Sequence, residues 1–363
     1  MTWAALAHTV PLFPLYALLF THTGLSDAQV STLFAIWSIT AVVAEVPLGA
    51  FADRFSRRWS VVASGTCQAA GYALWTALPG FPGFAAGFVL WGVGGALSSG
   101  ALEALLHDAL EAAGAAPAFA RVLGRVNAVS LLGQIPAALL ATTLFAAGGF
   151  PLVGWVSVGA CLAAAAVAVL LPETPRPAPE SYLTVLRTGL TETARTPGVA
   201  PTALLVAALL AVDAFEEYFP LLARDWGVPV VWAPLATLAI PLAGAAGAAL
   251  GGTGLPPGPL LAAAAVLLGV AGLAGHPAGL AAVAVFYGVY QFVLVGAEAR
   301  LQERITGDAR ATVTSVAGLG SEVLSLAVYA AWAVGGVPAV AAGVLLLAGC
   351  LTRLRRPAEH SQA

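Results

Sequence analysis

Long apolar runs, repeated along the whole chain and separated by short connections, constrain the fold more than any other feature. Most runs hold about 20 residues, the length an α-helix needs to cross the hydrocarbon core of a bilayer. Only 9% of the 363 residues are charged, against about 25% in an ordinary soluble domain. We therefore expect lipid, rather than water, around most of the surface.

Bounding the runs by Gly, Pro and charged clusters predicts an all-α integral membrane fold of twelve transmembrane helices. These are residues 2–20, 29–51, 60–79, 83–106, 122–146, 150–171, 199–220, 230–250, 258–275, 278–299, 311–333 and 336–353. The first run has no positively charged leader and no small-residue cleavage site, so we predict a retained helix rather than a signal peptide.

A polar stretch divides the runs into two groups of six. Residues 172–198 hold five prolines, three arginines and three glutamates, a composition typical of an exposed loop. The predicted organisation is an N-terminal six-helix half (1–171), a cytoplasmic central loop (172–198), a C-terminal six-helix half (199–353) and a cytoplasmic tail (354–363).

The arginines predict the orientation, because positively charged connections stay on the cytoplasmic side during insertion. All 15 basic residues are arginine. Only Arg224 falls in an odd-numbered connection. This alternation supports an even number of helices and places both termini in the cytoplasm.

Weak internal similarity links the two halves at an offset of about 195 residues. Glu103–Asp108 aligns with Glu298–Glu303, and Val46–Gly49 aligns with Ile240–Ala243. Two pseudo-symmetric halves related by an axis along the membrane normal would place a pathway at their interface.

The connection after the second run reads Gly-Ala-Phe-Ala-Asp-Arg-Phe-Ser-Arg-Arg from Gly49 to Arg58. It resembles the loop motif of the major facilitator superfamily, with Ser56 where glycine is usual. The resemblance implies the facilitator fold, transport by alternating access, and a gate that closes the cytoplasmic side. The residues it assigns to this gating motif are Gly49, Asp53, Arg54, Arg57 and Arg58. The alternative is a solvated loop that only obeys the positive-inside rule.

Further segments resemble the bacterial drug-efflux-like (drug:proton antiporter) members of the superfamily. They are Ala44–Gly49, Gly94–Ala104 with Asp108, Glu216–Pro220 and Arg310–Thr312. The turn of the second half that corresponds to the gating motif, at 251–257, carries no charge. Any second gate of this kind is absent or weak.

Ionisable and amide side chains at membrane depth are costly, so we expect each one to line a cavity or to pair with another polar group. Glu322 lies about 16 Å into its run, near the midplane, as do Gln134 and Gln291. Asp213 lies outward of centre, and Glu216 and Glu217 follow it at the i+3 and i+4 spacing that places all three on one helical face.

Desolvation disfavours the charged form of carboxylates that lack a cationic partner, which makes this set candidate proton carriers. Alternatively, Glu216 and Glu217 sit at the periplasmic mouth, solvated or paired with Arg224. Glu45 fits either the cavity or the cytoplasmic charges near Arg54 and Arg58.

Other charged residues lie at the predicted cytoplasmic ends of helices. We predict for them structural ion pairs or a gate, in one cytoplasmic charge network, rather than transport chemistry. They are Glu103, Asp108, Arg121, Glu298, Glu303 and Arg310.

Together these features predict a secondary active transporter in the bacterial inner membrane, not an enzyme. A chain without lysine has no phosphate-binding Gly-Lys loop, and metal clusters and catalytic triads are absent from the sequence. The expected activity is proton-coupled efflux of small amphipathic or cationic compounds; the alternative is uptake or facilitated diffusion of a small polar metabolite. We expect protons and the lipid bilayer as partners, with no cofactor and no nucleic acid, and a monomer.

Overall fold

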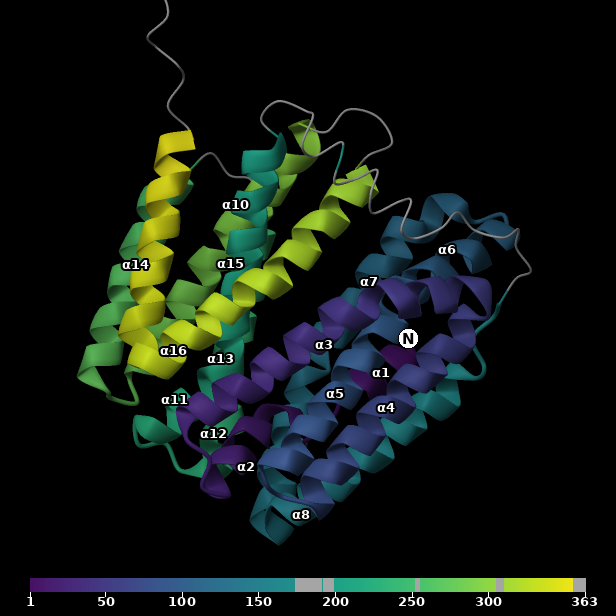
Figure 1. Cartoon of the computed structure of the whole chain (residues 1–363), viewed down its shortest axis with the longest axis horizontal. Coiled ribbons are helices and arrows are strands. Elements are labelled where there is room, and N and C mark those ends of the chain that lie inside the picture. Colours follow the sequence, from purple (N-terminus) through teal and green to yellow (C-terminus); the bar gives the residue numbers. More distant parts are fainter. Residues whose placement is uncertain (174–190, 192–198, 252–254, 305–309, 355–363) are drawn as a thin grey trace, which may run out of the picture. The chain divides into compact units, whose positions relative to one another are not determined.

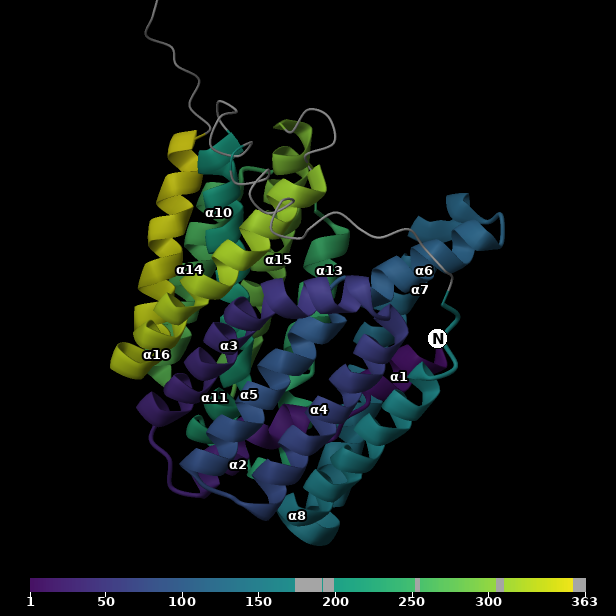
Figure 2. The same cartoon turned by 45° about the vertical axis from the view of Figure 1, so that its right-hand side comes forward.

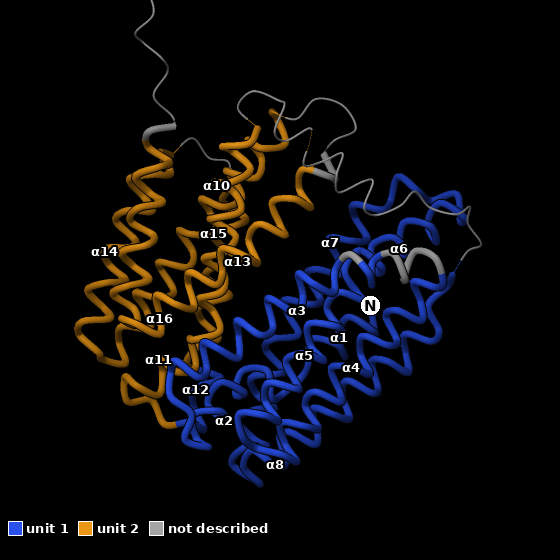
Figure 3. The backbone as a smooth tube through the Cα atoms, in the orientation of Figure 1, with its two compact units in different colours: residues 1–184, 230–235 blue, residues 185–229, 236–363 orange. Residues whose placement is uncertain are grey.

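The computed structural model describes residues 1–173, 191, 199–251, 255–304 and 310–354, with the side chains of 46, 50–54, 310–312 and 353–354 excepted. The secondary structure of this part is entirely helical (Figure 1). Contacts between Cα atoms divide the chain into unit 1, residues 1–184 and 230–235, and unit 2, residues 185–229 and 236–363 (Figure 3). The all-helical prediction is confirmed.

Unit 1 is built mainly from long helices that pack in pairs. Helix α3 packs on α5, α4 packs on both α5 and α8, and α1 packs on α8. The elements are α1 (Thr2–His8), η1 (Phe13–Leu15), α2 (Tyr16–His22), α3 (Asp27–Arg54), α4 (Arg57–Ala77), α5 (Phe81–Ser98), α6 (Ala101–Ala112), η2 (Ala116–Ala118), α7 (Phe119–Leu132) and α8 (Gln134–Ala168), with η4 (Val230–Trp232) grouped here.

Unit 2 repeats this pairing with its own helices. Helix α13 packs on α15, α14 packs on both α15 and α16, and α10 packs on α16 (Figures 1 and 2). Its elements are α10 (Val199–Ala211), η3 (Val212–Tyr218), α11 (Phe219–Asp225), α13 (Ala239–Ala249), α14 (Pro257–Ala274), α15 (Gly279–Arg304) and α16 (Arg310–Leu354). Helix α12 (Ala233–Thr237) spans the boundary of the two units. The correspondence supports the internal repeat that the sequence predicts.

The same local sequence breaks the longest helix of each unit. In α8, Gly148 and Gly149 leave the helical region, and Pro151 follows. In α16, Gly336 has φ 56° and Pro338 follows. Glycine adopts positive φ at little cost, and proline cannot supply the N–H of a continuing helix. Both breaks fall where the sequence places boundaries between membrane runs.

Nine helical stretches of the described residues are long and apolar enough to cross a bilayer. Two of them, Ala116–Ala168 and Val313–Thr352, each contain one of these breaks. Helix α4, which covers most of the predicted run 60–79, is not among the nine. The protein is a multi-pass membrane protein.

Glycine allows the closest helix crossings. A Cβ added to Gly247 of α13 would lie 1.9 Å from the carbonyl oxygen of Gly288 of α15. A Cβ at Gly87 of α5 would lie 3.0 Å from the carbonyl oxygen of Gly71 of α4. Small residues let helix backbones approach each other in lipid, where no hydrophobic force draws helices together.

Candidate functional site

Three carboxylates of unit 2 lie on a 3₁₀ segment inside a membrane helix. Helix α10 continues through η3, which carries Asp213, Glu216 and Glu217, into α11. Pro220, near the start of α11, has no N–H to donate to the Glu216 carbonyl, and the Phe219 amide donates to it instead. This local bonding favours the tighter 3₁₀ geometry.

The 3₁₀ geometry changes which carboxylates face the same way. With about three residues per turn, side chains at i and i+3 are eclipsed, so Asp213 and Glu216 align and Glu217 is turned by about 120°. The sequence prediction of one shared face assumed α-helical spacing. In the structure the three carboxylates do not all face the same neighbouring helix: two of them face one helix and the third faces another.

Asp213 and Glu216 face α15 and share one tyrosine. The Tyr287 hydroxyl lies 2.6 Å from Asp213 Oδ1 and 3.0 Å from Glu216 Oε2. Gln291, one turn further along α15, donates from Nε2 to the same Asp213 oxygen at 3.2 Å. Two of the predicted site residues, Asp213 and Gln291, are therefore in direct contact, and Tyr287 is a member that the sequence analysis missed.

The tyrosine hydroxyl is suited to a shared proton. A hydroxyl has one hydrogen to donate, and its lone pairs accept. It satisfies both carboxyl groups when it donates to one and accepts from the other, and a carboxyl group can donate only when it is protonated. The geometry of Asp213, Tyr287 and Glu216 therefore suits one bound proton.

Glu217 faces the other way, toward α16. Its side chain is 8% exposed, and Glu322 of α16 is near enough for the two charges to interact. Among the described residues Glu217 makes no hydrogen bond or ion pair, whereas Arg224 bonds its neighbour Asp225 at 2.6 Å. The alternative in which Arg224 neutralises Glu217 has no support in this arrangement.

The gating motif is largely helical. Helix α3 runs through Gly49 to Arg54, beyond the predicted end at 51, and only Phe55 and Ser56 separate it from α4. Ser56 has extended backbone, and its hydroxyl accepts from the Trp59 amide as the N-cap of α4. A non-glycine residue therefore fits this turn. The side chains of Asp53, Arg54 and Arg310 lie outside the described residues.

Two acidic residues meet the arginines at the start of α4. Arg57 pairs with Asp108 of α6, Nη1 to Oδ2, at 2.8 Å. Glu173, which follows α8, accepts from the Ser56 hydroxyl at 2.6 Å and from the Arg57 amide at 2.8 Å, with Arg58 Nε at 3.9 Å. Asp108, which the sequence analysis assigns to a charge network, thus has Arg57 as a defined partner.

Glu173 is a residue that the sequence analysis missed. Partial burial alone would raise the pKa of Glu173, but the hydrogen bonds from Ser56 and the Arg58 and Arg57 amides, with the Arg58 charge, lower it below its ordinary value. The sequence offers one signal for Glu173, which is its position. It comes just after a predicted membrane run whose end should lie on the same side of the membrane as the gating motif.

The other predicted residues lie on several helices. Glu45 is partly buried in α3, and Gln134 is the first residue of α8 rather than the middle of a helix. Three members of the predicted charge network, Glu103, Arg121 and Glu303, make no hydrogen bond or ion pair with another described residue. Glu298 is partly buried in α15, also without such a contact to the described part of the chain.

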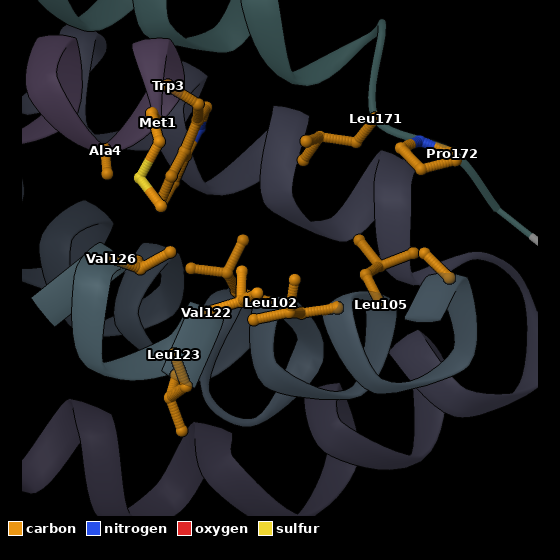
Figure 4. Close-up of a pocket in the computed structure, with 12 residues that line it drawn as sticks. Met1, Trp3, Ala4, Leu102, Leu105, Val122, Leu123, Val126, Leu171 and Pro172 are labelled. Atoms are coloured by element: carbon orange, nitrogen blue, oxygen red, sulfur yellow. The ribbon is translucent and has the colours of Figure 1, made fainter. Parts of the chain in front are cut away.

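Each unit also holds an apolar cavity. In unit 1, a cavity of ≈ 140 Å³ is lined by Trp3, Leu102, Leu105, Val126 and others from α1, α6 and α7 (Figure 4). Figure 4 shows apolar side chains directed toward this space. In unit 2, a cavity of ≈ 200 Å³ lies between α10 and α16, with Val212 as its contribution from η3. Such surfaces suit hydrocarbon, and of the side chains that the structure describes no charged one lines either cavity.

A comparison with protein families decides the identity. The model of the Major Facilitator Superfamily matches residues 1–330. The chain belongs to this superfamily. The resemblance carried by Gly49–Arg58 is thereby confirmed at the level of the superfamily, whose members are transporters, while the drug-efflux subgroup is not distinguished by this match.

Solved facilitator structures share the fold of this chain at low sequence identity. A bacterial homolog of the human lysosomal transporter Spinster, inward-facing and unoccupied, has a TM-score of 0.75 at 17% identity, covering 97% of this chain and 94% of its own. A D-xylose-proton symporter has a TM-score of 0.74 at 14% identity, covering 100% and 98%. The nucleoside transporter NupG has a TM-score of 0.70 at 14% identity, covering 97% and 94%. No curated protein matches the chain.

Proposed function

We propose that this facilitator is a proton-coupled exporter of small amphipathic or cationic compounds, with twelve membrane-spanning segments and both termini in the cytoplasm of a bacterium. The observation that carries the proposal is the position of the Tyr287 hydroxyl, 2.6 Å from Asp213 and 3.0 Å from Glu216. The side chains that hydrogen-bond within this group are carboxyl, hydroxyl and amide, so a proton is the simplest positive charge to balance it.

In the proposed cycle the group binds one proton when the cavity opens outward. The proton lies on Asp213 or Glu216, and Tyr287 links the two. When the cavity opens inward, arrival of a cationic compound favours loss of this proton, because both positive charges compete for the same negative field. The exchange of a bound proton for a cation between the outward-open and inward-open states then drives export.

Uptake of a small polar metabolite is the alternative. In that function Gln134 and Gln291 would recognise hydroxyl or amide groups of the substrate. The Gln291 amide already donates to Asp213 at 3.2 Å, which leaves less of its bonding capacity for a substrate and favours export of a cation. The D-xylose-proton symporter and NupG share only the fold with this chain at 14% identity.

Proton release on substrate binding tests the proposal. Tetraphenylphosphonium, a lipophilic cation, is added to the purified protein in weakly buffered detergent, and the pH change is recorded for the parent, Asp213→Asn and Glu216→Gln. We expect release from the parent and a loss of most of it in both variants. Glu111→Gln removes an exposed charge from α6 and serves as control. Undiminished release in both site variants would contradict the coupling assignment.

A further inference from the structure

Helices α1, α6 and α7 of unit 1 line an apolar cavity that the proposed transport cycle does not use. Its volume is ≈ 140 Å³, and Trp3, Leu102 and Leu171 form part of its wall (Figure 4). These three side chains also pack against a buried core. A cavity of about this size with apolar walls stays dry and admits small hydrocarbon groups. The occupant that fits it is therefore hydrocarbon.

Helix α7 also carries two arginines without a partner. Arg121 and Arg125 are exposed and lie at the i, i+4 spacing, where like charges repel each other. Neither makes a hydrogen bond or ion pair with another described residue, although the neighbouring helix α6 carries three carboxylates. One of these, Asp108, pairs instead with Arg57 at 2.8 Å. The arginine pair thus favours an anion from outside the chain.

The two arginines border the same edge of the cavity wall. Val122 and Val126 of α7 line the cavity, and at 3.6 residues per turn Arg125 and Arg121 lie roughly 60° and 100° from Val122 around the helix axis. Helix α7 lies near the start of the apolar stretch Ala116–Ala168. Long arginine side chains near the end of a span extend along apolar surface and place the guanidinium at headgroup level. One molecule can therefore contact both the arginines and the cavity.

We propose that Arg121, Arg125 and the adjoining cavity form a binding site for an anionic phospholipid. The guanidinium groups bind the phosphate, whose geometry they match, and part of one acyl chain fills the cavity. A free anion would leave the cavity unfilled, and a zwitterionic lipid would bring no net charge to the arginines. The site is independent of the substrate and of the direction of transport.

Brominated lipids test the site, because Trp3 in the cavity wall reports a bromine atom nearby by loss of fluorescence. Phosphatidylglycerol and phosphatidylcholine with identical brominated chains are titrated into the purified full chain in detergent. The difference between the parent and Trp3→Phe isolates the Trp3 signal. We expect phosphatidylglycerol to reach half-maximal quenching at a concentration about tenfold lower or more, the effect of two arginines near a lipid phosphate.

Matched variants separate the headgroup from the acyl chain. Arg121→Gln with Arg125→Gln should abolish the preference for phosphatidylglycerol, whereas lysine at both positions should retain most of it. Arg224→Gln removes an arginine of unit 2 and should match the parent. Ala109→Phe fills the cavity and should reduce Trp3 quenching by both lipids, whereas Ala331→Phe, in the apolar cavity of unit 2, should not. Thermal unfolding verifies that each variant is folded.

Four results would overturn the site. The first is equal quenching of Trp3 by both lipids in the parent, and the second is an undiminished preference in the double glutamine variant. Undiminished quenching in Ala109→Phe would show that the chain does not enter the cavity. Displacement of brominated phosphatidylglycerol by sodium phosphate, but not by sodium chloride of equal ionic strength, would indicate a site for a free anion. Absence of quenching by either lipid would mean that the protein itself, or a second copy, covers the cavity.

Discussion

The hydroxyl of Ser56 donates a hydrogen bond of 2.6 Å to Glu173 Oε2. This contact joins the start of α4 to the residue that follows α8, and the same Ser56 hydroxyl accepts from the Trp59 amide at 3.0 Å. Serine and glutamate thus satisfy N–H groups that a helix start leaves without partners. The serine that replaces the usual glycine of the motif therefore has a structural role of its own.

Replacing Glu173 with glutamine should lower stability in a pH-dependent way. Because the pKa of Glu173 is below its ordinary value of 4.5 in the folded protein, its stabilisation is fully present above pH 4.5 and is lost as the pH falls through the folded value. We expect a loss of about 0.5–1 kcal/mol at neutral pH, typical of a helix cap. Thermal unfolding of the parent and Glu173→Gln should differ at pH 7 and converge below pH 4.5. A difference that stays constant over this range would contradict the ionic contribution.

The ion pair of Arg57 and Asp108 should couple α4 to α6 modestly. The two side chains are 18% and 26% exposed, so solvent screens their attraction. A double-mutant cycle of Arg57→Gln and Asp108→Asn should give a coupling free energy of about 0.5–1 kcal/mol. The unfolding free energies of the four proteins supply the measurement, and additive effects of the two substitutions would show that the pair contributes nothing.

Substitution of Gly247 should disrupt the crossing of α13 and α15. The new methyl carbon of Gly247→Ala would lie 1.9 Å from the Gly288 carbonyl oxygen, so the helices must separate, at a cost of about 1–3 kcal/mol. Gly318→Ala, on α16, meets no atom of the described residues within 4 Å and should be neutral or stabilising, since alanine favours helix more than glycine does. Thermal unfolding midpoints compare the two. Equal effects would refute the close crossing.

Loss of the Tyr287 hydroxyl should impair proton coupling more than substrate binding. Tyr287→Phe keeps the ring, which packs edge-on against Phe219 with centroids 5.4 Å apart, and removes the hydrogen bonds to Asp213 and Glu216. A hydrogen bond to a charged group contributes about 1.5–3 kcal/mol, so we expect proton-driven exchange in proteoliposomes to slow by roughly tenfold or more. Tetraphenylphosphonium affinity in the same preparation is the internal control. A rate equal to that of the parent would remove Tyr287 from the coupling group.

Local patterns in the sequence determined the membrane-spanning character, the helix boundaries at the two Gly-Gly-x-Pro breaks, and the superfamily through Gly49–Arg58. These depend on run length, on glycine and proline backbone chemistry, and on residues adjacent in the chain. The sequence also identified Asp213, Glu216 and Glu217 as costly at membrane depth, because that inference requires only burial in lipid.

Only the tertiary structure decided which helix each of these carboxylates faces and which partner it has. Tyr287 is 74 residues from Asp213 in the chain, and Glu173 is 117 residues from Ser56, so no local pattern relates the partners. The 3₁₀ register of η3 turns Glu217 away from Glu216, a rotation that α-helical spacing does not predict. Packing of distant helices and the hydrogen bonds it permits, rather than local propensity, therefore determine which carboxylates bond to Tyr287 and which faces α16.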